Sequence, residues 1–561
     1  MTRALTAVAA SVVALSAATV QGIADAAPGD ISVTPLWFDI ATGPDGAQRC
    51  TIEGDLYRPS SASAATPVPA VLSTNGFGLT KDGLAGTGAM LAEQGYAALM
   101  YSGLGFGDST CTVGLDNPEW DGRAAQQLVS FLGGAAGIAH TDPALKNPAA
   151  AVDFIQTDQR GASGETLAHD PRVGMLGGSY GGAVQFAAAA TDPRIDTIVP
   201  MITWNDLSYS LSPDGAVGPA GQGKGGTGAT KSTWVTGLAA IGVLSPGVEG
   251  YLADPSRIFP CPNFSDTVCP ALGISLVQGF AGVEEAEYLQ STSVADYLDE
   301  VRVPVLLMQA QHDSLFDLQE ATATYHGLKQ RGVEVSMIWH YRGHGGDPIP
   351  GELNELAPNR DSDYLVSRYL DWFDRHLKDA PVAPAPEFSW FRDWVSYEGN
   401  SEPAYATAPN LDAAAVLTGL PLGPGAHSVR SGPDANPEDA AAWTSEPLTS
   451  DLVQVGAPQV TLNVSGASAA TAADAAVLFV TVYDLAPDGT ATRVGNPVPT
   501  RVSSDTTVEV TVPGAVHRFE PGHRVQVTVA GAADGFRSGL VPREVSVAVA
   551  GLGLPVARDA N

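Results

Sequence analysis

The sequence predicts an α/β fold built on a mostly parallel sheet, followed by a separate all-β domain. Up to residue 380, short apolar runs alternate with helical patterns and Gly-rich turns; beyond the Pro-rich linker at 381–387, apolar residues recur at every second position. Strands that alternate with helices form parallel sheets covered on both faces, whereas a two-residue period is typical of antiparallel sheets. A chain of 561 residues is long enough for both domains.

Six apolar runs in the first part have the length and composition of buried strands. They are Val68–Thr74, Tyr96–Tyr101, Val173–Leu176, Ile195–Ile202, Pro304–Gln309 and Val333–Trp339. Helical patterns lie between or after them, at Asp121–Leu132, Ala183–Ala190, Gln319–Lys329 and Tyr364–Lys378. In the last of these, apolar residues share one stripe at helical spacing, so we expect it to close a first domain that spans residues 27–380.

Residues 205–295 break this rhythm with a Gly-rich stretch, a Cys-containing loop and several helical patches. We expect this insertion to form a cap over the active site. Within it, Gly221–Gly226 matches G-x-G-x-x-G, and Gly218–Lys224 resembles a P-loop except that Gly225 stands where Ser or Thr is required. Neither motif follows a predicted strand, so we interpret both as a flexible loop of the cap.

Alternating valines, for example Val508, Val510 and Val512, predict that residues 388–561 form an antiparallel β-sandwich.

Composition excludes two classes of partner. The chain has 61 acidic and 29 basic residues, which gives a formal net charge of −32, and 44% of its residues are apolar. Neutralising phosphates requires Lys and Arg, so the charge argues against a nucleic-acid-binding protein and against docking on anionic lipid.

The N-terminus has the pattern of a secretory signal peptide. Arg3 precedes an apolar stretch, Ala4–Val20, and Ala24–Ala26 fits a small-x-small cleavage site. We expect residues 1–26 to be removed and the mature protein to be secreted; an uncleaved anchor is the alternative. No later run approaches the ~20 apolar residues of a membrane span, so we expect no membrane partner.

Four cysteines suit an exported protein with two disulfides. Cys261 and Cys269 are close and flank a Pro-rich loop, so we expect them to pair, which leaves Cys50 with Cys111. Four cysteines allow three connectivities, and the others remain open. The spacings are not of the CxxC type and no His clusters with them, so we predict no metal site.

Gly177–Gly181 is a G-x-S-x-G motif centred on Ser179. It follows an apolar strand and precedes a predicted helix, which is the context in which a tight turn presents a serine hydroxyl at the end of a parallel sheet. The alternative is a plain Gly-rich turn, since the chain contains 62 glycines. The strand-turn-helix context favours Ser179 as a nucleophile.

A serine nucleophile needs a base, and the α/β-hydrolase order is Ser, then Asp or Glu, then His. His344 follows the last predicted parallel strand and Asp313 follows the one before it, so both lie on loops at strand C-terminal ends. We predict that His344 accepts the serine proton and that Asp313 orients it. Asp317 is the alternative carboxylate.

Two other histidines are weaker candidates for the base. His340 lies inside a strand run, where we interpret it as a hydrogen-bonded sheet residue, and His312 is adjacent to Asp313 and would point elsewhere.

Acyl transfer also requires donors for the oxyanion. We assign the backbone N–H of Tyr180, which follows the nucleophile, and that of Phe77 in the loop Asn75–Gly78 after the first parallel strand. A simple turn at Gly76 and Gly78 is the alternative for the second donor.

With these residues in place, the chain resembles the Xaa-Pro dipeptidyl-peptidase/cocaine-esterase (CocE/NonD) family of α/β-hydrolases. The resemblance rests on the segments Tyr101–Ser109, Glu119–Arg123, Gly177–Gly182 and Phe519–Arg524. It implies an α/β-hydrolase domain with a helical cap and a C-terminal jelly-roll-like domain. It also implies cleavage of esters, amides or dipeptides ending in proline through an acyl-enzyme, with no cofactor.

Two departures from the family pattern bear on activity. Many members supply an oxyanion donor from a Tyr hydroxyl, where this chain has Phe77. The peptidases also carry extra N-terminal sequence and an acidic anchor for the substrate amine, which we do not identify here. We therefore predict a secreted acyl esterase acting on a small-molecule or peptide substrate. An Xaa-Pro dipeptidyl-peptidase is the alternative, and a catalytically dead binding protein is an alternative of another class. The oligomeric state stays open.

Overall fold

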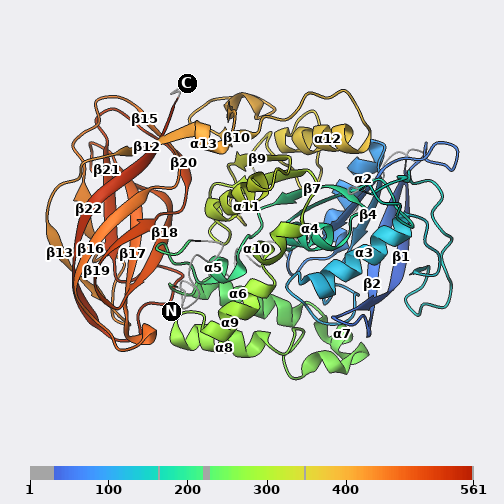
Figure 1. The fold of residues 1–561 in the computed structure, drawn as a ribbon, viewed down its shortest axis with the longest axis horizontal. Coiled ribbons are helices and arrows are strands. Elements are labelled where there is room, and N and C mark those ends of the chain that lie inside the picture. The colour runs from blue at the N-terminus through green and yellow to red at the C-terminus, as the bar shows by residue number, and fades with distance from the viewer. Residues whose placement is uncertain (1–30, 162–163, 219–227, 346–348, 559–561) are drawn as a thin grey trace.

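The computed structural model describes residues 31–161, 164–218, 228–345 and 349–558. The predicted signal segment 1–26 and the motif at 221–226 lie outside the described residues. Figure 1 shows an α/β domain on the right, a group of helices along its lower side and an all-β domain on the left. The fold is therefore the predicted α/β-hydrolase domain with an antiparallel β domain at its C-terminal end.

The α/β domain contains an 11-stranded mixed sheet in the order β11-β10-β9-β8-β7-β6-β3-β4-β2-β1-β5. Its strands are β1 Ile31–Thr42, β2 Gln48–Pro59, β3 Ala70–Thr74, β4 Ala97–Tyr101, β5 Ala139–His140, β6 Val173–Gly178, β7 Ile195–Met201, β8 Val305–Ala310, β9 Val335–His340, β10 Phe388–Phe391 and β11 Tyr405–Ala408. The six predicted parallel strands are confirmed as β3, β4 and β6 to β9, within two residues at each end. The long antiparallel pair β1 and β2 was not predicted.

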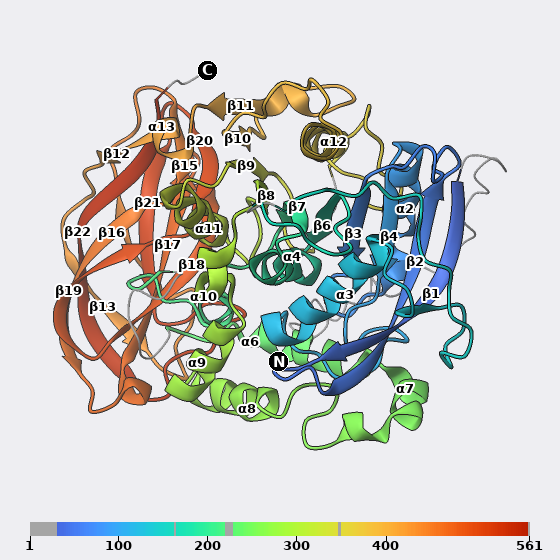
Figure 2. The same ribbon diagram turned by 45° about the vertical axis from the view of Figure 1, so that its right-hand side comes forward.

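Helices cover both faces of this sheet (Figure 2). They are η1 Lys81–Leu84, α2 Ala85–Glu93, η2 Pro118–Gly122, α3 Arg123–Leu132, α4 Tyr180–Thr191, α11 Leu318–Gln330 and α12 Tyr364–Leu377. Alternate strand residues face the two layers: Leu72 and Leu307 share a core with α3, α4 and α11, whereas Val71 and Leu306 pack with α2 and α12. Near-continuous apolar strands are thus explained by burial on both faces.

The predicted boundary at residue 388 is wrong, because the chain returns to the hydrolase sheet after the linker. Strand β10 pairs in parallel with β9, with Phe388 opposite Met337, and β11 pairs with β10. All four residues of β10 are buried. Its short Phe388–Phe391 run has no pattern that distinguishes a final sheet strand from the first strand of a sandwich.

The cap lies between β7 and β8. Its described helices are α5 Leu207–Leu211, α6 Ser232–Leu244, α7 Gly247–Ala253, η3 Pro255–Ile258, α8 Val268–Gln278, α9 Val283–Ser291, α10 Val294–Tyr297 and η4 Leu298–Glu300. Within the described ranges, no single helix is long and apolar enough to cross a membrane, although the bent pair α6 and α7 reaches that length and composition when taken together.

The C-terminal domain packs two antiparallel sheets face to face. After η5 Glu402–Ala404 and α13 Leu411–Ala414, its elements are β12 Ala415–Gly419, β13 Ala426–Ser431, β14 Ala441–Thr444, β15 Leu452–Gly456, β16 Gln459–Ser468, η6 Ala472–Asp474, β17 Ala476–Leu485, β18 Ala491–Val502, β19 Ser504–Thr511, β20 Ala515–Phe519, β21 Arg524–Ala530 and β22 Arg543–Ala557. One sheet has seven strands and the other the order β14-β21-β17-β18. Inward residues of both sheets, such as Val460, Leu462 and Val480, form its core.

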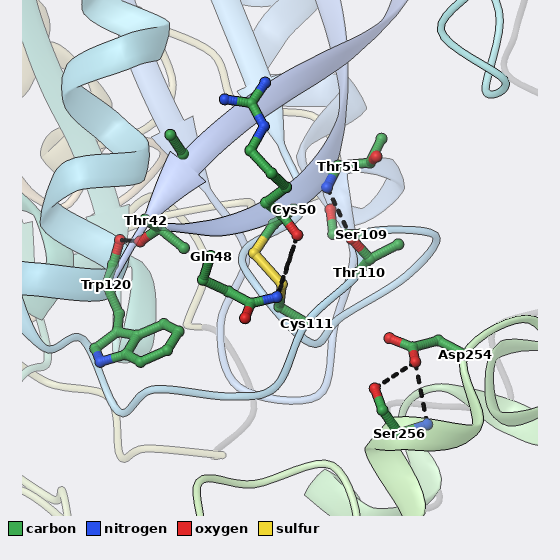
Figure 3. Close-up of a disulfide and its surroundings, with 12 residues drawn as sticks. Thr42, Gln48, Cys50, Thr51, Ser109, Thr110, Cys111, Trp120, Asp254 and Ser256 are labelled. Atoms are coloured by element: carbon green, nitrogen blue, oxygen red, sulfur yellow. Dashed lines mark hydrogen bonds between the residues drawn. A yellow bond between two sulfur atoms is a disulfide. The ribbon is translucent and has the colours of Figure 1, made fainter. Parts of the chain in front are cut away.

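Both expected disulfides are present, Cys50–Cys111 and Cys261–Cys269. The first ties β2 to the loop after β4, where the backbone N–H of Thr51 also donates to Thr110 Oγ1 (Figure 3). The same loop carries Phe106, whose ring packs edge-on against Tyr180 at 5.3 Å between centroids. The disulfide thereby fastens a loop that supports the residue next to Ser179.

Candidate active site

Ser179 occupies the turn between β6 and α4. Its φ of 56° and ψ of −119° are a strained conformation for a residue with a side chain, as expected for a nucleophile turn. The turn is held by two hydrogen bonds: the Ser179 N–H donates to Met201 O at 2.9 Å, and Thr203 Oγ1 donates to Ser179 O at 2.9 Å. These bonds, to the last residue of β7 and to a residue just after it, keep the strained turn in place.

Two glycines of the motif are required by close packing. A Cβ on Gly177 would lie 2.5 Å from Gly181 O, and a Cβ on Gly181 would lie 2.3 Å from Thr74 O. Both distances are shorter than real carbon–oxygen contacts, and both neighbours are backbone atoms. The turn can therefore be this tight only with glycine at these positions.

His344 and Asp313 are brought to Ser179 from the loops after β9 and β8. Ser179 Oγ lies 2.9 Å from His344 Nε2, and His344 Nδ1 lies 2.8 Å from Asp313 Oδ2. Asp313 is fully buried, and its Oδ1 accepts the N–H groups of Leu315 and Phe316, both at 2.8 Å. This carboxylate can hold the ring so that Nε2 is free to accept the serine proton.

The alternative residues lie elsewhere. Asp317 accepts from Tyr209 and from the N–H of Gln319 at the start of α11, so it is a helix cap and not a partner of His344. The ring of His312 packs on Tyr341.

His340 ends β9 as predicted, but the expectation that it is hydrogen-bonded is wrong for Nδ1. This atom makes no hydrogen bond within the described residues and lies 3.9 Å from Glu352 Oε2. Burial, with Arg342 nearby, lowers the pKa of His340 to about 3, so its ring is neutral. A neutral ring explains how the sheet tolerates this histidine.

The two predicted oxyanion donors are backbone N–H groups that have no other use in the described structure. Within the described residues, neither the N–H of Tyr180 nor that of Phe77 donates a hydrogen bond to another group. Tyr180 begins α4, where a helix N-terminus favours negative charge. The Phe77 ring packs between Phe106, Tyr180 and Phe264, which holds its backbone beside the serine turn.

A cavity of about 110 Å³ opens beside Ser179 and Tyr180, between the sheet and the cap. Its lining is almost wholly apolar and contains no Asp, Glu, Lys, Arg or His. Cap helix α6 contributes one wall, and the loop after Asp313 contributes another; representative lining residues are Trp204, Leu211, Val235, Leu238, Phe264 and Phe316. An apolar cavity favours an apolar group and penalises an unpaired charge.

Two cap residues that the sequence did not single out support the loop after Asp313. Lys231 is buried and its Nζ donates to Leu315 O at 2.8 Å, while Trp234 Nε1 donates to Ser314 Oγ at 3.2 Å. Burial lowers the pKa of Lys231, and the nearby carboxylates of Asp317 and Asp313 oppose that shift. No sequence motif marks these residues, because they act through the three-dimensional contact of the cap with a distant loop.

Two buried carboxylates, Asp116 and Asp121, lie behind Tyr180. The Tyr180 hydroxyl donates to Asp121 Oδ1 at 3.4 Å and accepts from the N–H of Asp116 at 3.3 Å. Both Asp116 oxygens and Asp121 Oδ2 have no hydrogen-bond partner in the described part of the chain. Burial raises the pKa of Asp121 from 3.8 to about 7. Burial also raises the pKa of Asp116, and the nearby charge of Asp121 adds to this shift.

Replacing Asp121 with asparagine should stabilise the protein above pH 7. Between about pH 4 and pH 7 the folded state keeps a proton on Asp121 that the unfolded state has lost, so wild-type stability falls as pH rises through this window. Asparagine does not titrate, so the variant avoids this loss of stability, which reaches about 4 kcal/mol above pH 7 because one pKa unit corresponds to about 1.4 kcal/mol. Thermal unfolding of wild type and Asp121→Asn from pH 4 to pH 9 checks this, with exposed Asp45→Asn as the control. Parallel curves for wild type and Asp121→Asn would contradict it.

Comparison with known proteins gives two matches to family models. Residues 45–237 match the X-Pro dipeptidyl-peptidase (S15 family) model, and residues 392–535 match the model of the X-Pro dipeptidyl-peptidase C-terminal non-catalytic domain. A Rhodopirellula baltica protein, assigned by name to the Xaa-Pro dipeptidyl-peptidases, is 23% identical over 222 residues, or 38% of this chain. The matched stretch spans only 32% of that protein's length.

Two solved structures are similar over almost the whole chain. A CocE/NonD family hydrolase from Staphylococcus aureus has a TM-score of 0.63 at 14% identity, covering 96% of this chain and 99% of its own. An α-amino acid ester hydrolase has a TM-score of 0.57 at 15% identity, with coverage of 96% and 99%. At sequence identities of 14% and 15%, these structural similarities establish the fold alone.

The fold and the two family models together define the class of the protein, a serine hydrolase. The two model matches cover more than half of the chain. The protein belongs to the X-Pro dipeptidyl-peptidase (S15) family.

Proposed function

We propose that this protein is a secreted serine esterase that hydrolyses esters of short apolar acids through Ser179, His344 and Asp313. The observation that carries the choice of substrate is the cavity beside Ser179, which has no charged lining residue. A dipeptidyl-peptidase must bind a protonated substrate amine, and a cationic group in this cavity would be left without a partner. An uncharged acyl group incurs no such penalty.

The contacts at the site support a two-step acyl transfer. Ser179 Oγ attacks the ester carbonyl carbon while His344 Nε2 takes its proton, and Asp313 stabilises the resulting imidazolium. The N–H groups of Tyr180 and Phe77 receive the oxyanion. The C–O bond then breaks, His344 returns the proton to the departing alcohol, and an acyl-Ser179 ester remains.

Hydrolysis of this acyl-enzyme repeats the steps with water. His344 takes a proton from the attacking water, the second tetrahedral intermediate collapses, and the proton passes back to Ser179 Oγ as the free acid leaves. The cap, about residues 205–295, supplies much of the acyl cavity, so we propose that it sets acyl preference.

Export is supported by two features. Residues 1–26 have the pattern of a signal peptide, and all four cysteines are paired in disulfides, which persist mainly in oxidising compartments.

An Xaa-Pro dipeptidyl-peptidase is the second candidate, favoured by the family model that matches residues 45–237. It would require an amine anchor outside the described lining of the cavity beside Ser179.

We expect kcat/KM for p-nitrophenyl esters to rise about fourfold per methylene from acetate to butyrate, because each buried methylene contributes about 0.8 kcal/mol. Longer chains should lose this gain, since a cavity of about 110 Å³ is smaller than the ~150 Å³ apolar cavity that holds benzene. Steady-state kinetics on a chain-length series measures this, and Ala239→Leu, which narrows the cavity, should move the optimum to acetate.

The same kinetic assay also tests alanyl-proline p-nitroanilide as a substrate, with the Ser179→Ala protein as the blank. Ser179-dependent release of nitroaniline at a kcat/KM close to that of the best ester would overturn the esterase proposal in favour of the dipeptidyl-peptidase.

A further inference from the structure

A side chain of the C-terminal domain reaches the backbone of the proposed catalytic aspartate. Asn496 Nδ2 donates to Asp313 O at 2.8 Å, across 183 residues of sequence. Asn496 lies in β18, inside the segment that matches the family model described as non-catalytic. The family model describes this domain as non-catalytic, yet one of its side chains contacts the centre of the hydrolase domain.

The local structure of β18 is arranged to present this side chain. Strand β17 pairs with β18 at Val480–Val498 and again at Val482–Val494, so three residues of β18 lie opposite one residue of β17. The three are Gly495, Asn496 and Pro497. Such bulges redirect side chains and are frequent beside active sites.

The sequence of the bulge explains its shape. Gly495 has a φ of 78°, a conformation that suits glycine, and Pro497 has no N–H to pair with the neighbouring strand. Asn496 between them is released from the regular alternation of the strand and turns toward the hydrolase domain.

The loop that Asn496 contacts sets the direction of the Asp313 carboxylate. Asp313 Oδ1 is held by the N–H groups of Leu315 and Phe316, which leaves Oδ2 for His344. Lys231 holds the carbonyl of Leu315 from the cap, and Asn496 holds the carbonyl of Asp313 from the C-terminal domain. The turn is thus fixed by one donor from each neighbouring part of the molecule.

We propose that Asn496 is a positioning residue for the hydrolase reaction, and that the C-terminal domain thereby completes the catalytic centre. The proposal rests on the proposed function, because it assigns Asn496 an action through Asp313. Asn496 orients the 313–314 peptide, and through it the Asp313 carboxylate that holds His344. It does not line the acyl cavity, so it acts on the chemical step and not on substrate binding.

The domain that carries Asn496 is firmly docked. The N–H of Gly215 in the cap donates to Pro499 O at 2.8 Å, the N–H of Thr511 donates to Gly215 O at 2.8 Å, and the N–H of Gly514 donates to Gln319 Oε1 at 3.3 Å. These bonds flank Asn496 along β18 and the strands after it. Because the domain is docked through several separate contacts, the loss of one of them should leave Asn496 in place.

The test compares Asn496→Ala and Asn496→Asp with wild type in the full-length protein, using p-nitrophenyl butyrate. We expect kcat to fall about tenfold for Ala and further for Asp, with KM unchanged and the melting temperature within a few degrees. Asp has the shape of Asn but accepts where Asn donates, so a space-filling role would rank the two variants in the opposite order. Gln319→Ala, which removes a neighbouring contact between the domains, is the matched control and should keep wild-type kcat.

The two variants are also made on the Asp313→Asn background. If Asn496 acts through Asp313, its replacement there costs no further kcat, whereas an additive loss would overturn the proposal. A kcat within twofold of wild type for both single variants would overturn it too, as would a change confined to KM or to the melting temperature. Full activity of Asp313→Asn would instead refute the triad itself, and the proposed function with it.

Discussion

Replacing Ser179 with alanine should lower kcat by about 10⁴- to 10⁶-fold while leaving the fold intact. The change removes one atom, the Oγ that lies 2.9 Å from His344 Nε2, and keeps the Cβ that the turn already accommodates at a φ of 56°. The hydrogen bonds that hold the turn use the backbone of Ser179 and are retained. Turnover of p-nitrophenyl butyrate and the melting temperature measure the two parts of this expectation.

Covalent labelling separates the enzyme from an inactive binding protein of the same fold. A fluorophosphonate should label wild type at Ser179, located by peptide mass spectrometry, and should fail to label Ser179→Ala. Exposed Ser61→Ala is the matched control and should label normally. Turnover or labelling that survives in Ser179→Ala would assign the chemistry to another residue.

Replacing Asp313 with asparagine should lower kcat by about 10⁴-fold. The amide oxygen can still accept the N–H groups of Leu315 and Phe316, which turns the NH₂ group toward His344 Nδ1. Nδ1 must then be the unprotonated nitrogen, so Nε2 carries the hydrogen and cannot take one from Ser179. The expected result is a large loss of kcat with little change in KM, measured by steady-state kinetics.

Asp317→Asn is the informative comparison for this variant. Asp317 caps α11 and does not contact His344, and asparagine can accept the same capping hydrogen bond, so its replacement should reduce kcat by less than tenfold. A larger kinetic loss for Asp317→Asn than for Asp313→Asn would transfer the orienting role to Asp317.

The residues brought together at the site were predictable because each follows a recognisable strand. The G-x-S-x-G motif specifies a tight turn by its glycines, and parallel strands deliver the residues after β8 and β9 to the same edge of the sheet. Chain order then separates Asp313 and His344 from the many other acidic residues and histidines. Local sequence and sheet topology were sufficient for this part.

Other features depend on contacts that no local pattern records. Lys231 reaches the Asp313 loop from the cap, and Asn496 reaches it from the C-terminal domain. Each donates a hydrogen bond to a backbone carbonyl that is distant in sequence. The acyl cavity likewise combines cap helices with hydrolase loops, so its lack of charge emerges only when they assemble. Strand β10 was assigned to the wrong domain because Phe388–Phe391 is apolar in either setting.

The return of β10 and β11 to the hydrolase sheet has a consequence for how this protein could have been assembled in evolution. A chain that stopped at the Pro-rich linker would leave β9 at the border of the sheet, with its backbone N–H and C=O groups free to recruit a strand from another molecule. Recombination at the linker would therefore yield an aggregation-prone enzyme. A viable breakpoint lies beyond Ala408, after β10 has paired with β9 and the border of the sheet has passed to the short strand β11.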